Sequence, residues 1–123
     1  MTQERLSLGK KGESLAASHL QRLNYKILER NYKCLLGEMD IIAREKETLV
    51  FIEVKTRGTR DFGGPAAAVN ERKQRQLSKV ALTYLKQKKL TDFPARFDVV
   101  AVEFIPPLFR IEVIRNAFEL HYG

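Results

Sequence analysis

Residues 50–57, with the sequence Val-Phe-Ile-Glu-Val-Lys-Thr-Arg, constrain this chain more than any other segment. The Val, Ile and Phe residues are typical of a buried β-strand, yet Glu53 and Lys55 stand in its middle. Because side chains alternate between the faces of a strand, Glu53 and Lys55 are predicted to share one face. Charged groups are costly to bury without partners, so other parts of the chain have to supply those partners.

A second strand is predicted at residues 38–44, and the polar residues 45–47 are predicted to form a hairpin loop between the two strands. Alternation along this second strand predicts that three residues share one face: Met39, Ile41 and Ala43. A loop centred between residues 46 and 47 places Asp40 directly opposite Glu53, with Cβ atoms ~4.5 to 5.5 Å apart. A loop with an odd number of residues would instead turn Asp40 to the other face.

Two carboxylates at that distance repel each other, and a divalent cation that prefers oxygen ligands would compensate for the repulsion. A metal on Asp40 and Glu53 would polarise a phosphoryl oxygen and orient a hydroxide, which is the chemistry of phosphodiester cleavage. Lys55 would add positive charge near the attacking water or the developing phosphorane charge. The same residues also allow a cluster of surface ion pairs on an exposed sheet face, so both interpretations remain open.

A helix is predicted at residues 9–24 from apolar residues at helical spacing: Ala16, Ala17, Leu20 and Leu23. Glu13 precedes Ala16 by three residues, so it is expected near the buried side of this helix. There it could hold a metal-bound water or a second ion. Alternatively, Glu13 is a first-turn residue that the helix dipole favours and that reaches solvent.

A second helix is predicted at residues 70–89, with Asn70 as its N-cap. Seven basic residues lie between positions 71 and 90 against the single acidic Glu71: Arg72, Lys73, Arg75, Lys79, Lys86, Lys88 and Lys89. A solvated helix face explains most such runs, although the charge also suits a phosphate backbone. The glycine-rich residues 58–65 are predicted to form a loop before this helix.

The remaining segments complete one predicted domain over residues 1–123. Residues 25–36 are expected to be extended but irregular, and Gly37 to mark a turn or bulge. Strands are predicted at residues 97–104 and 108–115, and the tail from residue 116 gives no clear signal. The order of helix, three strands, helix and two strands predicts a sheet with helices covering it, in an α/β or α+β arrangement.

The net charge of +7 favours a polyanionic partner such as nucleic acid, but ribosome-associated and merely soluble proteins are often as basic. The one cysteine and two histidines provide no zinc site at a recognised spacing. No apolar run approaches the ~20 residues that span a bilayer, and the first residues lack the pattern of a secretory signal. We therefore expect a cytoplasmic protein with no membrane contact.

Residues 37–43, Gly-Glu-Met-Asp-Ile-Ile-Ala, followed by residues 50–57, resemble the two-part signature of the PD-(D/E)xK, or restriction-endonuclease-like, nucleases. More closely, the chain resembles the small bacterial YraN-like endonuclease-related family, which is similar to archaeal Holliday-junction resolvases. The likeness continues in three further blocks: Gly12-Glu13 with Ala16-Ala17, Val69 with Arg72-Lys73-Gln74, and residues 96–103. Met39 stands where the superfamily pattern has its loosely kept proline.

The resemblance implies an α/β fold with a central mixed sheet flanked by helices, the αβββαβ nuclease core. It implies that Asp40 and Glu53 bind Mg²⁺ or Mn²⁺ and that Lys55 assists catalysis. Glu13 corresponds to the acidic helix residue of the resolvase-like branch, which also binds metal, and Gln74 to a polar helix residue that lines such sites. Five basic residues are expected to contact nucleic acid: Arg57, Arg72, Lys73, Arg75 and Lys79.

Together these expectations describe a metal-dependent endonuclease, with DNA as a better supported substrate than RNA. Branched DNA and a homodimer follow from the resolvase resemblance, with a sheet edge or residues 104–109 as the candidate seam. Two alternatives belong to other classes of protein. One is a nucleic-acid-binding module that keeps the nuclease fold without cutting, and the other is an interaction protein whose charge docks it to an acidic partner or the ribosome.

Overall fold

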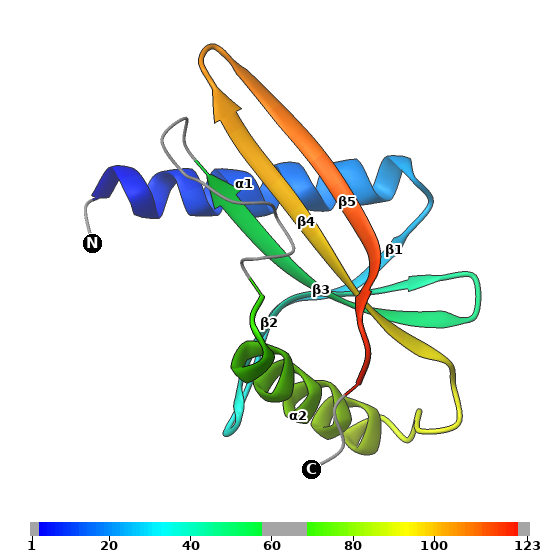
Figure 1. The fold of residues 1–123 in the computed structure, drawn as a ribbon. Coiled ribbons are helices and arrows are strands. Elements are labelled where there is room, and N and C mark those ends of the chain that lie inside the picture. Colours follow the sequence, from blue (N-terminus) through cyan, green and yellow to red (C-terminus); the bar gives the residue numbers. More distant parts are fainter. Residues whose placement is uncertain (1–2, 58–68, 121–123) are drawn as a thin grey trace.

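A computed structural model of the protein describes residues 3–57 and 69–120, and the predicted loop at residues 58–65 lies outside this part of the chain. A five-stranded sheet has its strands in chain order, and only the β3–β4 pair is parallel (Figure 1). The elements are α1 (Gln3–Arg22), β1 (Lys26–Cys34), β2 (Gly37–Glu45), β3 (Thr48–Arg57), α2 (Glu71–Gln87), β4 (Ala95–Ile105) and β5 (Leu108–Phe118). The predicted element order is therefore confirmed.

The sheet separates two apolar cores, one beneath each helix. Val50 and Ile52 of β3 point to the core that Ala16 and Leu20 of α1 cover, whereas Phe51 points to the core beneath α2. This alternation follows from the period of two along a strand, and burial of apolar residues on both faces explains the nearly continuous apolar run of β3. Neither helix in the described part of the chain is long and apolar enough to cross a membrane.

Several element boundaries differ from the sequence-based prediction. Helix α1 begins at Gln3 and ends at Arg22, because Asn24 adopts a left-handed conformation with a φ of 69° that no helix continues. The segment predicted to be extended but irregular forms strand β1, which is irregular in that its pairing with β2 shifts register between Ile27 and Glu29. Strand β5 continues to Phe118, whose ring stacks on Phe97 with 4.5 Å between the ring centroids. Asn70 caps α2 as predicted, accepting a hydrogen bond from the Lys73 backbone N–H.

The predicted alternation along β2 is wrong at one end. Ile41 and Ala43 lie in the core beneath α1 as one face, but Met39 lies in the core beneath α2. The regular pleat is interrupted between them, at Asp40. Opposite this position on β1, Asn31 has a φ of 55°, a left-handed conformation that twists the strand pair locally.

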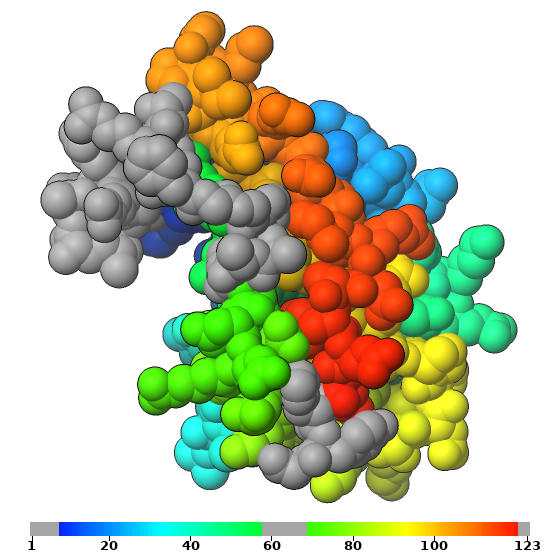
Figure 2. Space-filling model, viewed as in Figure 1, coloured from blue at the N-terminus to red at the C-terminus, as the bar shows by residue number. Residues whose placement is uncertain are grey.

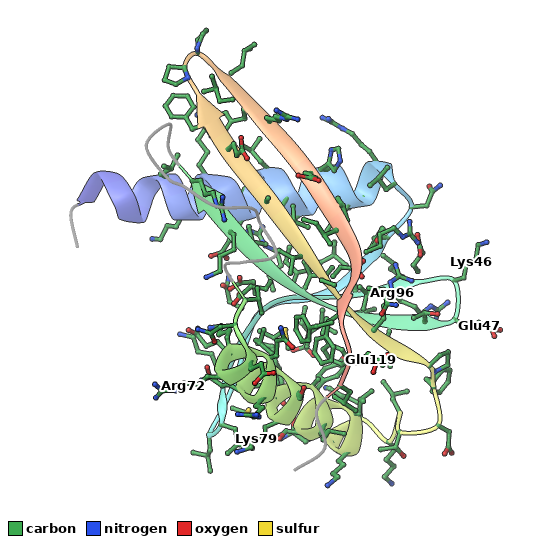
Figure 3. The ribbon with its side chains drawn as sticks, viewed as in Figure 1. Lys46, Glu47, Arg72, Lys79, Arg96 and Glu119 are labelled. Atoms are coloured by element: carbon green, nitrogen blue, oxygen red, sulfur yellow. The ribbon has the colours of Figure 1, made fainter. Side chains whose placement is uncertain are left out.

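A buried polar network joins the opposite end of the sheet to the turn after α1. Asp98 is 0% exposed and accepts hydrogen bonds from the Tyr25 hydroxyl at 2.7 Å, Arg96 Nε at 3.0 Å and the Asn116 backbone N–H at 2.9 Å. Arg96, labelled in Figure 3, also donates to Glu45 in β2 at 2.8 Å. Burial and the Asp98 carboxylate raise the pKa of Tyr25 to about 12. This network thereby connects strands β2, β4 and β5 to the turn after α1.

Replacing Asp98 by Asn should lower the free energy of unfolding by about 3 kcal/mol, because the Arg96 guanidinium would lose the charge that compensates its burial. Urea unfolding measures this loss. Asp92→Asn, at an exposed position after α2, is the matched control and should change the free energy by less than about 0.5 kcal/mol. Equal stability of the Asp98 variant and wild type would contradict the role given to this network.

Candidate active site

Strands β2 and β3 separate at the position where the sequence predicts the site. Their pairing runs from Glu45↔Thr48 to Ile41↔Ile52, in the register expected for a two-residue loop, and then ends. Beyond that point β3 continues beside β4, whereas β2 runs toward α2 (Figure 1). Gly37, at the start of β2, lies so close to α2 that an added Cβ would be 2.8 Å from Gln76 Nε2. The two strands therefore open into a fork.

The Asp40 side chain bridges this fork. Its Oδ2 atom accepts a hydrogen bond of 2.8 Å from the Val54 backbone N–H, a donor that has lost its strand partner on this side. A buried backbone donor has to be satisfied, and here a carboxylate does so in place of a carbonyl. The bond also fixes the direction of the carboxylate. Asp40 is thus held against β3, beside the residue that precedes Val54.

That residue is Glu53, and its carboxyl group contacts the carboxyl group of Asp40. Glu53 points to the α2 side of the sheet and is 7% exposed. The pKa of Glu53 is raised to about 8, first by burial, then by the hydrogen bond with Asp40 and the negative charge of Asp40. Near neutral pH Glu53 therefore holds a proton that it shares with Asp40. The predicted meeting of these two side chains is present in the structure.

Two amines surround this acidic pair. Lys73 Nζ lies 3.3 Å from Glu53 Oε2, and the charges of Lys73 and then Lys55 lower the pKa of Glu53 against the larger upward shift. Although Lys73 and Glu53 meet at ion-pair distance, Glu53 is mostly protonated. The ammonium balances the single negative charge that remains on the Asp40–Glu53 pair. With one shared proton and Lys73, the acidic pair is close to neutral before any metal binds.

Lys73 was expected on the nucleic-acid-binding face, and its place beside Glu53 is a site role that the sequence prediction missed. A signal for it existed, since Lys73 precedes the buried Leu77 by four residues and Val80 by seven. Residues at this spacing share one face of a helix. Lys73 therefore lies on the stripe of α2 that packs against the sheet. A lysine on an apolar stripe, one turn after the N-cap, indicates an acidic partner inside.

Glu13 approaches the pair from the other side of the sheet. Helix α1 comes so close to β3 that a Cβ added to Gly12 would lie 2.1 Å from Thr56 Oγ1, so only glycine fits at this contact. Glu13 is half-buried, and its pKa is raised first by burial and then by the negative charge of Asp40. Within residues 3–57 and 69–120, however, no three acidic, His or Cys side chains converge as a metal cluster. Glu13 acts on Asp40 through its charge.

The other predicted site residues lie around this centre. Gln74 Nε2 donates to the Val69 carbonyl at 2.9 Å, which ties down the start of α2. Arg75 pairs with Glu71 along the helix at 3.5 Å. Arg72 and Lys79 project outward from α2, as Figure 3 shows. Arg57 ends β3 and is half-buried.

The Asp40–Glu53 pair fits a divalent cation with oxygen ligands. Mg²⁺ is commonly held by one or two carboxylates, with water and substrate phosphate completing its shell, so a third protein ligand is not needed. The buried position of Glu53 strengthens the attraction to a cation, because the surroundings screen charge poorly. A cation of charge two could replace both the shared proton and the Lys73 ammonium at Glu53. Asp40 and Glu53 are the residues that would hold it.

The mixed five-stranded sheet with a helix on each face is an α/β fold, consistent with a restriction-endonuclease-like core. The profile of the Uncharacterised protein family UPF0102 matches residues 12–102, a range that includes Glu13, Asp40, Glu53 and Lys55. A UPF0102 protein of Syntrophus aciditrophicus is 52% identical over 123 residues, covering 100% of this chain and 96% of that protein. One of Geobacter metallireducens is 54% identical over 116 residues, covering 94% and 95%. The chain belongs to the UPF0102 family.

The raised pKa of Glu53 predicts how the stability of the metal-free protein depends on pH. Between the ordinary carboxyl pKa of 4.5 and about 8, folded Glu53 binds a proton that the unfolded chain has released. The free energy of unfolding should therefore fall as the pH rises through this window. Glu53→Gln, which resembles the protonated form, should remove most of this dependence in urea unfolding at about pH 6 and about pH 8.5. The exposed Glu47→Gln is the control, and an unchanged slope in the Glu53 variant would refute the assignment.

Lys73→Met should strengthen Mn²⁺ binding by about fivefold, because the ammonium competes with the metal for Glu53; this corresponds to ~1 kcal/mol. Isothermal titration calorimetry measures the affinity directly. Lys79→Met removes the same charge from the outer side of the same helix and should leave the affinity nearly unchanged. Weaker binding in the Lys73 variant would mean that Lys73 does not occupy the position of the cation.

Proposed function

We propose that this protein is a Mg²⁺- or Mn²⁺-dependent endonuclease that hydrolyses phosphodiester bonds in DNA. One observation carries the proposal: the Asp40 and Glu53 carboxyl groups meet in the fork between β2 and β3, with the amine of Lys73 beside them. Two convergent carboxylates next to amines suit phosphoryl chemistry, since they can hold a cation while the amines attract the phosphate. The resemblance of residues 37–43 and 50–57 to the PD-(D/E)xK signature supports the same reaction.

Each side chain then has a distinct task. A bound metal would supply a Lewis acid and a more acidic water. Asp40 holds its carboxylate in the direction that the Val54 N–H fixes, and Glu53 supplies the buried second oxygen ligand. Lys55 shares the face of Glu53 and adds positive charge where the phosphorane charge develops. Lys73, released from Glu53, lies within reach of a phosphate oxygen, and Glu13 orients water at the outer side of Asp40.

The proposed partner is DNA, with RNA as the less favoured nucleic acid. The chain carries a net charge of +7, and the outward residues Arg72 and Lys79 of α2 lie on the helix that also carries Lys73. Contacts of this kind bind a phosphate backbone and do not read sequence. The cytoplasm is the proposed location. A homodimer, as the resolvase resemblance implies, would allow two strands to be cut symmetrically.

A second candidate is a nucleic-acid-binding module that keeps the fold without cutting. The position of the Lys73 amine, 3.3 Å from Glu53, favours it, because an internal cation already balances the acidic pair. Such a module would have no need of a metal at Asp40. Its affinity for nucleic acid would not change with Mg²⁺ or Mn²⁺ at constant ionic strength.

A cleavage assay separates the two candidates. The substrates are linear duplex, single-stranded, flapped and four-way-junction DNA, together with RNA, each with Mg²⁺, Mn²⁺ or chelator. Wild type should cut at least one DNA with metal and none with chelator. Asp40→Asn should lower the rate by about 100-fold or more, because the cation loses a charged ligand at the reacting centre, and Lys55→Ala should lower it as well.

Glu38→Gln is the matched control, because Glu38 is an exposed acid on the same strand, paired with Lys33 at 3.6 Å. It should cut at the wild-type rate. No cleavage of any substrate with either metal would favour the binding module. Cleavage that survives the Asp40 and Lys55 changes would place the activity outside this site or in a contaminant.

A further inference from the structure

The turn between β1 and β2 presents two leucines to solvent. Cys34 pairs with Gly37, so Leu35 and Leu36 alone form the turn, and Leu35 is fully exposed while Leu36 is 50% exposed. Two-residue turns normally carry Gly, Asn or Asp, and the fully exposed Leu35 adds no buried apolar surface to the core. The left-handed conformation is instead supplied by Gly37, with a φ of 142°. The leucines therefore call for an explanation outside the core.

This turn is anchored on α2 rather than loosely attached. The Tyr32 hydroxyl donates to Gln87 Oε1 at 2.6 Å, and the Tyr32 ring meets the Tyr84 ring edge-on with centroids 5.2 Å apart. Gln76 Nε2 donates to the Leu36 carbonyl at 3.5 Å. Contacts along the length of α2 thus fix the direction of the hairpin. Leu35 and Leu36 form a preorganised apolar tip, which loses little conformational freedom when it binds a partner.

The surroundings of the tip are basic. A groove between the turn and α2 is lined by Lys33, Cys34, Leu35, Leu36, Thr83 and Gln87. Lys79 lies between Gln76 and Thr83 on the same helical stripe, and both Lys79 and Arg72 project near the turn (Figure 3). The cyan atoms of the turn lie beside the green atoms of α2 in Figure 2. An apolar tip within positive charge is complementary to stacked bases within a phosphate backbone.

We propose that Leu35 and Leu36 act as a wedge that enters the base stack of DNA where the duplex is interrupted, at a branch or flap. The proposal rests on the DNA-directed function above. Opening an intact stack costs free energy that is least where bases are already unpaired. The wedge therefore selects interrupted over continuous duplex. A second copy of this chain is the less suitable occupant, because it would bring another net charge of +7 to a basic surface.

The geometry also limits where the cut falls. Leu35 and Asp40 belong to one hairpin and are five residues apart in sequence. At ~3.3 Å per residue the Cα atoms of Leu35 and Asp40 lie at most ~17 Å apart, and one strand of DNA advances ~3.4 Å per nucleotide. Cleavage should therefore fall within about five nucleotides of the branch.

A binding experiment without metal tests the wedge independently of cleavage. The probes are a flapped DNA and a continuous duplex of equal length, each with 2-aminopurine at the branch position, in chelator. Wild type should bind the flap about tenfold more tightly than the duplex, and 2-aminopurine fluorescence should rise on binding as the base unstacks. The double variant Leu35→Ser/Leu36→Ser should bind the flap and the duplex with the same affinity, which is that of wild type for the duplex. Its binding should cause no rise in 2-aminopurine fluorescence.

Ile105→Ser/Leu108→Ser is the matched control, since Leu108 is 71% exposed at the tip of the β4–β5 hairpin, far from α2 (Figure 1). It should keep the preference for the flap and the fluorescence change. Flap preference that survives in the Leu35/Leu36 variant would overturn the wedge, as would its equal loss in the Leu108 control. Sedimentation that shows the Leu35/Leu36 change dissociating a dimer would assign the tip to self-association. Binding to vesicles with anionic lipid that the same change abolishes would assign it to a membrane.

The proposed function and the wedge can fail separately. If wild type cuts no substrate but the Leu35/Leu36 variant loses its flap preference, the wedge stands and belongs to a binding module. If wild type cuts flaps within about five nucleotides of the branch and the variant cuts at the same place and rate, the nuclease stands and the wedge is overturned.

Discussion

The hydrogen bond between the Val54 N–H and the Asp40 carboxylate is the contact on which the arrangement of the site depends. Two adjacent strands of a sheet normally satisfy each other with backbone groups, but β2 and β3 stop doing so after Ile41↔Ile52. The carboxylate of Asp40 replaces a carbonyl at the first unpaired donor. This one hydrogen bond therefore links β2 to β3 just beyond their last paired residues. It also brings a negative charge against the buried Glu53. The Asp40 side chain therefore satisfies the backbone of β3 and is also part of the candidate site.

The balance of charge at this point explains why Lys73 lies beside the acidic pair. Two ionised carboxylates in contact would destabilise a poorly solvated pocket, and a shared proton together with Lys73 removes most of that cost. Lys73 comes from α2, so the acidic pair also helps to fix this helix over the sheet. A cation that binds Asp40 and Glu53 competes with that contact. In the proposed nuclease, metal binding would therefore be linked to the position of α2 and to the basic groups that the helix carries.

The local sequence pattern was enough to predict the register of β2 and β3. It did not predict where the regular alternation along β2 is interrupted. The polar two-residue loop predicted the observed register from Glu45↔Thr48 to Ile41↔Ile52, but not that pairing ends there, so Asp40 and Glu53 meet through their side chains and not as paired residues. Local pattern failed at Met39, because the twist that moves it under α2 arises from Asn31 on another strand. The network around Asp98 was missed for a similar reason, since its partners are up to 73 residues away in sequence. Long-range packing determines both features, and no short segment encodes them.

The β1–β2 hairpin joins two requirements that usually conflict. In the proposed nuclease, its inner end would have to place Asp40 within a fraction of an ångström for metal and phosphate chemistry, which favours rigidity. Its outer end presents Leu35 and Leu36 to a partner, and exposed apolar tips in flexible loops promote nonspecific association. Anchoring on α2 through Tyr32 and Gly37 serves both ends at once. Because one stiff element carries the carboxylate and the tip, a change in the docking of α2 would shift Asp40 and the Leu35–Leu36 tip together.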